Sequence, residues 1–296
     1  MESNFLVVFP FPLMLLTIIT IFFSLTSSQP IDSKSDQDAL LAFKRSIKNG
    51  ALSNNWLTNT SICDWTGVSC GSKHGRVTSL NLTGFGLEGN LTPHLGNLTF
   101  LQSLDVSSNS LTGVLPAELS KLQRLQEINA ASNNLSGEIP RSIFTNMSVL
   151  VEIDVSNNKL SGGLPGDMCS NTPKLRRLIL RENQIYGNIP MSIDKCREME
   201  ELSLSTNRFN GNIPIGIGNL SMLTLLSMYE NHLQGNIPSS IFNISSLESM
   251  YLFSNRLSGN IPSKLNNLPN LRELYLYENN LEGTFNNFEP STLSIF

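Results

Sequence analysis

The sequence predicts an α/β repeat solenoid, a right-handed superhelix with a concave parallel β-sheet and a helical, disulfide-stapled cap at its amino end. Three observations predict it. An asparagine recurs every 24 or 25 residues within one apolar frame, an apolar stretch of different composition opens the chain, and a short cysteine-bearing segment lies between the two. Because a stack of repeats grows in one dimension, a length of 296 residues does not imply several globular domains.

The repeated frame reads LxxLxLxxNxLxGxIP, as in residues 247–262. Apolar residues alternate around Met250 and Leu252, which is the periodicity of a strand, and they return at Leu257 and Ile261 after a turn. One such unit cannot bury its apolar side alone, whereas stacked units can. The period and the spacing therefore indicate a leucine-rich-repeat solenoid.

The recurring asparagine stands where each strand turns away from the sheet. Its amide both donates and accepts hydrogen bonds, so it suits backbone groups of adjacent coils that would otherwise be buried without partners. We expect these side chains to form a ladder along the stack, made of Asn109, Asn133, Asn158, Asn183, Asn207, Asn231, Asn255 and Asn279.

Nine repeats of 24 to 25 residues fill positions 77–292. The first repeat has Phe85 in the asparagine position, and the ninth lacks the Ile-Pro step after Gly283. Atypical end units are expected in a repeat stack. Residues 293–296 read as the start of a truncated tenth repeat, which stops without a cap.

Residues 1–28 are predicted to be a secretory signal peptide. The run from Leu13 to Leu25 is almost entirely apolar, and small residues precede Gln29. The alternative is a signal anchor that stays in the membrane, but the run is shorter than the ~20 residues that a span needs. One departure from the usual pattern is that Glu2 carries the only charge ahead of the apolar run.

Residues 29–76 are predicted to form a separate cap. A capping-box-like start at residues 35–38 precedes apolar residues at helical spacing, and Asn49-Gly50 supplies a stop signal. An amphipathic helix is therefore expected between these two points. We expect the cap to cover the apolar edge of the first repeat.

The four cysteines fall into two pairs. Cys63 and Cys70 enclose six residues in a chain predicted to be secreted, which favours a disulfide that staples the cap over the first repeat. A zinc site is the alternative, and no histidine lies at ligand spacing to support it. Cys169 and Cys196 lie on the outward half of consecutive repeats, where strands are about 4.8 Å apart. For them a disulfide and two buried free thiols both stay open.

Eight glycosylation motifs of the form Asn-x-Ser/Thr agree with a secreted chain. They lie at Asn59, Asn81, Asn90, Asn97, Asn134, Asn146, Asn219 and Asn243. Asn81 is expected on the inner face of the first strand, where a glycan would obstruct that end of the sheet.

A ligand site is predicted from strand geometry. The two residues that flank the second strand leucine point away from the core and line the concave sheet. In repeats seven to nine these positions carry aromatic side chains, which offer large contact area at low entropic cost. The alternative is that tyrosine and phenylalanine simply favour strands. The predicted ligand-binding residues are Tyr229, Tyr251, Phe253, Tyr275 and Tyr277, with Arg181 in repeat five as a weaker candidate.

Charge and composition exclude other functions. A net charge of −4 with 15% charged residues provides no basic field for nucleic acid. His74, His94 and His232 sit in unrelated repeat positions, and no Ser-His-Asp or Cys-His set converges. We therefore predict no enzyme, no cofactor and no metal site in these residues.

Several segments together resemble the amino-terminal ectodomain of plant leucine-rich-repeat receptor-like serine/threonine kinases. They are Asp38-Ala-Leu-Leu-Ala-Phe-Lys44, Trp56, Cys63-Asp-Trp-Thr-Gly-Val-Ser-Cys70, Arg76-Val-Thr-Ser-Leu-Asn-Leu82 and the repeated Leu-x-Gly-x-Ile-Pro. Residues 89–98 are similar to the subgroup of immune receptors that sense bacterial flagellin and elongation factor. The resemblance implies a plasma-membrane receptor that binds a peptide or protein on the concave face, recruits a co-receptor kinase and signals through an intracellular kinase domain.

The chain departs from that family plan after its ninth repeat, because no further repeats, transmembrane helix or kinase domain follow. We expect a truncated receptor, which would lie on the extracellular side of the plasma membrane at full length and would be secreted if truly short. Two alternatives remain, a secreted inhibitor similar to the polygalacturonase-inhibiting proteins and a decoy scaffold without a ligand of its own.

Overall fold

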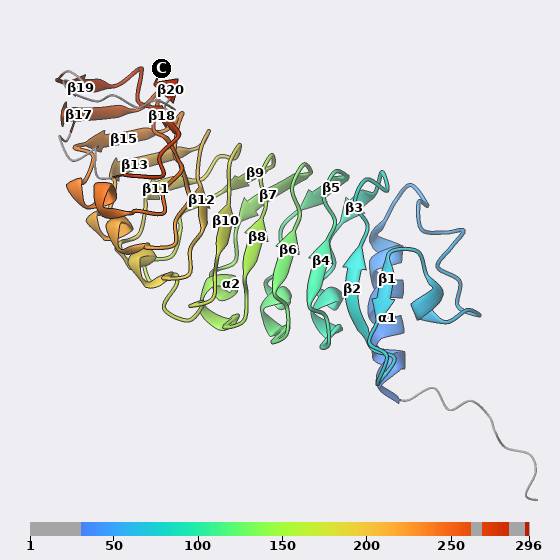
Figure 1. Ribbon diagram of the computed structural model, residues 1–296. Coiled ribbons are helices and arrows are strands. Elements are labelled where there is room, and N and C mark those ends of the chain that lie inside the picture. Colours follow the sequence, from blue (N-terminus) through green and yellow to red (C-terminus); the bar gives the residue numbers. More distant parts are fainter. Residues whose placement is uncertain (1–30, 262–267, 284–293, 296) are drawn as a thin grey trace, which may run out of the picture.

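The computed structural model describes residues 31–261, 268–283 and 294–295 (Figure 1). The signal peptide predicted for residues 1–28 lies outside this range. Figure 1 shows a curved stack of coils with the cap at the amino end and the helical turns aligned along one side. Among the described residues no helix is both long and apolar enough to cross a membrane.

The cap consists of α1 (Ile31–Ser46), the short 3-10 helix η1 (Ile62–Asp64) and β1 (Val68–Cys70). The helix was expected to start at residues 35–38, and this prediction was wrong. The helix α1 already includes Ile31, so residues 35–38 lie inside it. The side chain of Asp36 turns toward the first repeat and is not available as a cap. Trp56 and Trp65 stack at 5.2 Å between ring centroids and fill the core of the cap together with Phe43.

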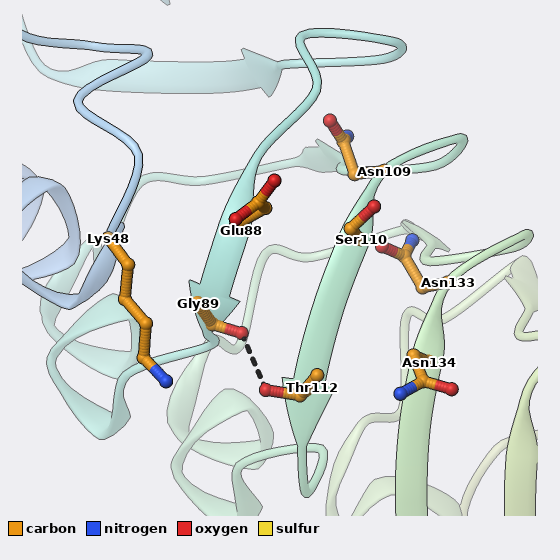
Figure 2. A pocket seen from close by; sticks show the side chains of 8 residues that line it. All are labelled: Lys48, Glu88, Gly89, Asn109, Ser110, Thr112, Asn133 and Asn134. Carbon is orange, nitrogen blue, oxygen red and sulfur yellow. Dashed lines mark hydrogen bonds between the residues drawn. The ribbon is translucent and has the colours of Figure 1, made fainter.

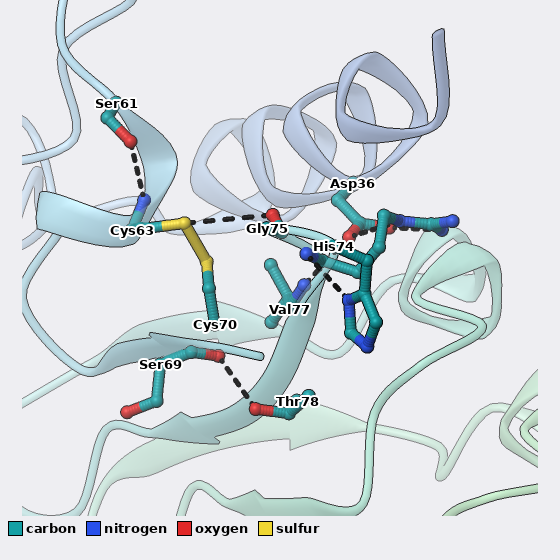
Figure 3. The surroundings of a disulfide bond; sticks show 10 residues. Asp36, Ser61, Cys63, Ser69, Cys70, His74, Gly75, Val77 and Thr78 are labelled. Carbon is teal, nitrogen blue, oxygen red and sulfur yellow. Dashed lines mark hydrogen bonds and ion pairs between the residues drawn. A yellow bond between two sulfur atoms is a disulfide. The ribbon is translucent and has the colours of Figure 1, made fainter. Parts of the chain in front are cut away.

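A buried ion pair joins the cap to the first repeat. Both carboxylate oxygens of Asp36 accept hydrogen bonds of 2.9 Å from Arg76, and one also accepts from the backbone N–H of Val77 (Figure 3). The two side chains are 0% and 5% exposed. Arg76 donates further to Thr99 and lies over the ring of Phe100. The pair is thus fully hydrogen-bonded, which burial of two charges requires.

The concave sheet contains eleven strands. β1 pairs antiparallel with β2, and every later neighbour pairs in parallel. After β1 the strands are β2 (Val77–Asn81), β4 (Ser103–Asp105), β6 (Glu127–Asn129), β8 (Glu152–Asp154), β10 (Arg177–Ile179), β12 (Glu201–Ser203), β14 (Leu225–Ser227), β16 (Ser249–Tyr251), β18 (Glu273–Tyr275) and β20 (Ser294–Ile295).

Two further parallel sheets run along the side of the stack, and we call them the lateral sheets. One comprises β3 (Glu88–Asn90), β5 (Ser110–Gly113), β7 (Asn134–Glu138) and β9 (Lys159–Ser161). The other comprises β11 (Tyr186–Asn188), β13 (Arg208–Asn212), β15 (His232–Gly235), β17 (Arg256–Asn260) and β19 (Asn280–Glu282). Glycine is required at the end of β13, because Gly211 has a φ of +72° and an added Cβ would lie 2.5 Å from the side-chain oxygen of Asn188.

Short helices form the outer side of the coils. They are η2 (Pro93–Asn97), η3 (Ala117–Lys121), α2 (Arg141–Asn146), η4 (Met191–Lys195), η5 (Ile215–Asn219) and η6 (Ser239–Asn243). Five of the six begin directly after the proline of an Ile-Pro step, or of Leu115-Pro116 in the case of η3, and the φ of these prolines lies between −66° and −57°. The pyrrolidine ring fixes φ near this value, so the proline sets the direction in which each helix starts.

The ladder asparagines satisfy the backbone at the strand ends. In each of the eight, the amide nitrogen donates to three backbone carbonyls and the amide oxygen accepts one backbone N–H from the coil before. Asn207, for example, donates to Leu180, Leu204 and Ser205 and accepts from Ile185 at 2.9 Å. Every ladder side chain therefore ties two consecutive coils together.

Both cysteine pairs are bonded in the structure. Cys63 and Cys70 have Cα atoms 5.5 Å apart and close a loop inside the cap (Figure 3). This disulfide holds β1, and the pairing of β1 with β2 then connects cap and repeats. It therefore acts on the first repeat only indirectly. Cys169 and Cys196 have Cα atoms 5.1 Å apart and join the outer segments of repeats four and five.

We expect Asp36→Ala to destabilise the protein strongly. Removing one partner leaves the Arg76 guanidinium buried without its counter-charge, which typically costs about 3–5 kcal/mol. The free energy of unfolding is measured by urea denaturation followed by circular dichroism. Asp38→Ala is the matched control, because Asp38 is exposed on the same helix. Equal urea midpoints for the two variants would show that the ion pair does not hold the cap.

We expect Asn207→Ala to cost more than about 3 kcal/mol, since it leaves one buried N–H and three carbonyls without their partner. The same urea titration measures it. The control is Asn210→Ala, which removes an exposed amide in the same repeat. A loss below about 1 kcal/mol, close to what a surface substitution costs, would contradict the ladder's role.

Candidate functional site

The concave sheet presents three outward-facing columns of side chains. Two of them flank the second leucine of each strand, as the sequence predicts, and contain the aromatic residues of repeats seven to nine. The third column lies two residues before the first of these and was missed. In register along the sheet it contains Ser79, Ser103, Glu127, Glu152, Arg177, Glu201, Leu225, Ser249 and Glu273.

The aromatic side chains stack along the columns. Tyr229 lies 4.4 Å from Phe253 between ring centroids, and Phe253 lies 4.6 Å from Tyr277, with interplanar angles of 6° and 12°. In the next column Tyr251 stacks on Tyr275 at 5.2 Å. Strand pairing in register brings these rings within stacking distance. The structure thus brings the five predicted aromatic residues together in one cluster.

Stacking also changes how much of each ring is open to solvent. Tyr277 is 43% exposed, whereas the other four aromatic residues are half-buried against one another. Only the ring at the end of the column is therefore classed as exposed. A ligand would meet ring edges and the outer faces of the stack.

A carboxylate from the missed column orients one of the tyrosines. The hydroxyl of Tyr251 donates to Glu273, which lies one strand further along the sheet. Ser249 Oγ donates to the same carboxylate at 3.4 Å. Because its hydroxyl is already engaged, Tyr251 presents its ring to a ligand more than its O–H group.

A chain of charged groups precedes the aromatic cluster. Arg177 donates to Glu152 and to Glu201 at 3.0 Å each, so one guanidinium bridges carboxylates on both neighbouring strands. Arg181 pairs with the adjacent Glu182 at 3.2 Å and is about half exposed. Arg177 is therefore held between two carboxylates of neighbouring strands, whereas Arg181 has an ion pair with the adjacent residue at the surface.

Glu152 is electrostatically unusual. Burial raises the pKa of its carboxyl above the ordinary value of 4.5, while the Arg177 guanidinium acts in the opposite direction. The negative charges of Glu127, Asp154 and Glu201 add to the increase. The concave face around repeat four is thus crowded with carboxylates that one arginine only partly neutralises.

A groove of about 360 Å³ lies between this charged network and the aromatic cluster. Ile179 and Leu225 provide the apolar part of its lining, and Ser203 and Ser227 also line it. Ile179 is buried although it does not belong to the hydrophobic core cluster and lines the groove. The groove is lined by Asp154, Arg177, Ile179, Arg181, Glu201, Ser203, Leu225, Ser227, Tyr229 and Tyr251.

Three further charged residues lie at the ends of these strands or outside the concave face. Glu230 and Glu278 follow the aromatic strands and accept hydrogen bonds from Thr206 and Ser254 of the preceding coil. Arg256 begins β17 of the lateral sheet and does not belong to the concave face. Asn81 ends β2 and is exposed, next to Asp105 in the neighbouring strand.

The chemistry of the site is that of binding. Aromatic rings, two guanidinium groups, several carboxylates and an apolar floor provide contacts for a polar and partly apolar ligand. Within the described ranges no group of three or more His, Cys, Asp or Glu side chains is arranged to hold a metal ion.

Comparisons with known proteins agree with the repeat architecture. Residues 33–71 match the leucine rich repeat N-terminal domain, and residues 100–122, 132–185, 198–220 and 246–268 match leucine rich repeat models. These ranges together cover more than half of the chain. The protein belongs to the leucine-rich-repeat proteins.

Relatives with similar sequences include plant receptor kinases. The chain is 40% identical over 79 residues to the LRR receptor-like serine/threonine-protein kinase EFR of Arabidopsis thaliana, a match that covers 25% of this chain and 8% of EFR. It is also 38% identical over 86 residues to the receptor protein kinase EMS1 of the same plant, covering 28% and 7%. Because both relatives match to a similar degree, the immune subgroup stays a prediction.

Solved structures lead to the same class. The LRR ectodomain of the Arabidopsis receptor kinase GASSHO1/SCHENGEN3, solved with CASPARIAN STRIP INTEGRITY FACTOR 2, superposes with a TM-score of 0.68 at 32% identity over 82% of this chain and 32% of that one. The Arabidopsis receptor kinase HAESA, solved with the peptide hormone IDA and the co-receptor SERK1, gives 0.56 at 27% identity, covering 83% and 50%. The chain thus resembles part of a receptor-kinase ectodomain, a fold of ligand-binding type.

The raised pKa of Glu152 predicts a pH dependence. Since this pKa lies above the unfolded value, the contribution of Glu152 to stability is complete below about pH 4.5 and is lost as pH rises through the folded pKa. We therefore compare the free energies of unfolding of the wild type and of Glu152→Gln. The wild-type value minus the variant value should decrease as the pH increases from about 4.5 through the folded pKa. Urea titrations at a series of pH values measure the difference, with Glu127→Gln giving the effect of removing one charge from the same column. A difference that grows with pH would contradict the assignment.

Proposed function

We propose that this chain is the extracellular ligand-binding portion of a leucine-rich-repeat receptor-like kinase. Its ligand is a peptide or protein that lies along the concave face of repeats five to nine. The observation that carries the proposal is the stacked aromatic cluster beside the groove of about 360 Å³. Aromatic anchors next to a partly apolar depression are the composition of a binding hot spot.

Each part of the groove has a distinct role in this proposal. The edges of Tyr229 and Tyr251 hold apolar side chains of the ligand over Ile179 and Leu225. Arg181, which among the described residues forms an ion pair with its exposed neighbour Glu182, orients an acidic or peptide group. Arg177 is already hydrogen-bonded to two carboxylates, so it shapes the groove and does not itself bind the ligand.

Partners and location follow from the same proposal. HAESA, a structural neighbour, is solved with both a peptide hormone and a co-receptor, so we propose a peptide ligand and a co-receptor kinase for this protein as well. The two disulfides suit an oxidising compartment, which supports the extracellular side of the plasma membrane. No observation on the described residues favours the secreted inhibitor over the receptor.

The aromatic cluster can be tested with a peptide library displayed on phage and selected on the purified chain. We expect peptides that bind the wild type to lose about 100-fold or more in affinity for the triple variant Tyr229→Ala, Phe253→Ala, Tyr277→Ala, because truncating one hot-spot residue costs about 2 kcal/mol or more and the losses of neighbouring residues do not add fully. Biolayer interferometry measures the dissociation constants.

The control is Tyr186→Ala. Tyr186 is the one tyrosine of the five in the sequence that lies outside the aromatic cluster. It is 52% exposed and begins β11 of the second lateral sheet. Circular dichroism checks that both variants remain folded. Unchanged affinity in the triple variant, or an equal loss in Tyr186→Ala, would remove the concave site from consideration.

A further inference from the structure

A second groove lies on the first lateral sheet, away from the concave face (Figure 2). It has a volume of about 550 Å³ and crosses from the cap to the third repeat. Its lining side chains are charged or polar apart from Gly89, and none of them is aromatic. The lining residues are Lys48, Glu88, Gly89, Asn109, Ser110, Thr112, Asn133 and Asn134.

One wall of this groove carries a glycosylation motif. Asn134-Leu135-Ser136 begins β7, and Asn134 is exposed. Figure 2 shows its amide on the wall of the groove, and it makes no side-chain hydrogen bond to the residues that the structure describes. The amide nitrogen is therefore free to be modified without the loss of a native contact.

A second motif on the same sheet differs in this respect. Asn90, Thr112 and Asn134 are in register on three neighbouring strands. Thr112 Oγ1 shares a hydrogen bond of 2.8 Å with the side chain of Asn90 and donates to the backbone carbonyl of Gly89. The Asn90 amide is thus engaged by the sheet, whereas the Asn134 amide is not.

We propose that Asn134 carries an N-linked glycan whose first sugar residues lie in this groove. The reaction joins Asn134 Nδ2 to C1 of an oligosaccharide delivered on a lipid pyrophosphate. The new N–C bond replaces the bond from C1 to the pyrophosphate oxygen, and the amide nitrogen loses one proton. The proposal does not depend on the ligand site, because it concerns a different face of the stack.

Tethering makes the docking favourable. A sugar attached to the groove wall is present at an effective concentration in the millimolar range, so weak contacts are enough to keep it bound. N-acetylglucosamine offers hydroxyl groups and an acetamido group as donors and acceptors. The exposed side chains of Lys48 and Glu88 and the hydroxyl of Ser110 provide matching partners around the groove.

A glycan in this groove would also cover the junction between the cap and the first repeat. Lys48 follows α1 in the cap, and its backbone N–H donates to Glu88 of the first repeat at 2.6 Å. A sugar that contacts Lys48, Glu88 and the third repeat together covers the junction between cap and repeats. The glycan thus shields an edge where backbone groups come close to solvent.

The test compares glycan release at individual sites. The chain is produced through the secretory pathway of human cells and treated with peptide N-glycanase in H2 18O, either native or denatured. Glycopeptide mass spectrometry then measures the labelled aspartate formed at each site. Asn219 and Asn243 are internal controls, since both are exposed at the ends of the outer helices η5 and η6.

We expect Asn134 to be occupied and its glycan to be released about tenfold more slowly than those at the control sites in the native protein, as a docked fraction of about 90% requires. After denaturation the rates should be equal. Lys48→Ala with Glu88→Ala, both at exposed positions, should bring the native rate at Asn134 close to that of the controls. An unoccupied Asn134, or equal rates at all three sites in the native protein, would overturn the proposal.

Discussion

From the second repeat to the ninth, each strand is followed by backbone groups that neither a sheet nor a helix satisfies, and the ladder asparagines supply the missing hydrogen bonds. The geometry that they hold is strained. The residue before each ladder asparagine is not glycine and has a φ between 50° and 56°, a left-handed conformation that costs about 1–2 kcal/mol. Three donated hydrogen bonds and one accepted bond per asparagine offset that cost. The concave columns stay in register only because these turns repeat identically.

The ligand site inherits this register. Stacked rings at 4.4 and 4.6 Å require that Tyr229, Phe253 and Tyr277 leave three consecutive strands in the same direction. The charged network around Arg177 depends on the same alignment, since one guanidinium reaches carboxylates on both sides. A small shift of one coil would therefore disturb both the aromatic cluster and the ion pairs.

Periodicity was enough to predict the fold and two of the three concave columns from the sequence, because strand alternation determines which side chains face outward. The third column, with Glu152, Arg177 and Glu273, was missed because only the residues flanking one leucine were considered. The Asp36 pair was hidden for another reason. Asp36 and Arg76 are 40 residues apart, and a helix-start motif gave a plausible local use for the acid. Contacts distant in sequence leave no periodic signal.

Repeat length varies only on the outer side of the coils. The two 25-residue steps of the ladder contain α2 in the third repeat and, in the fourth, the turn around Cys169, where φ is +65°. An extra residue is thus absorbed where the chain is helical or irregular, and the distance from strand to asparagine never changes. Duplication or loss of whole units in evolution would leave the ladder intact, whereas an insertion within the strand segment would be eliminated by selection. The binding face can lengthen and change its side chains independently of the ladder that keeps its strands in register.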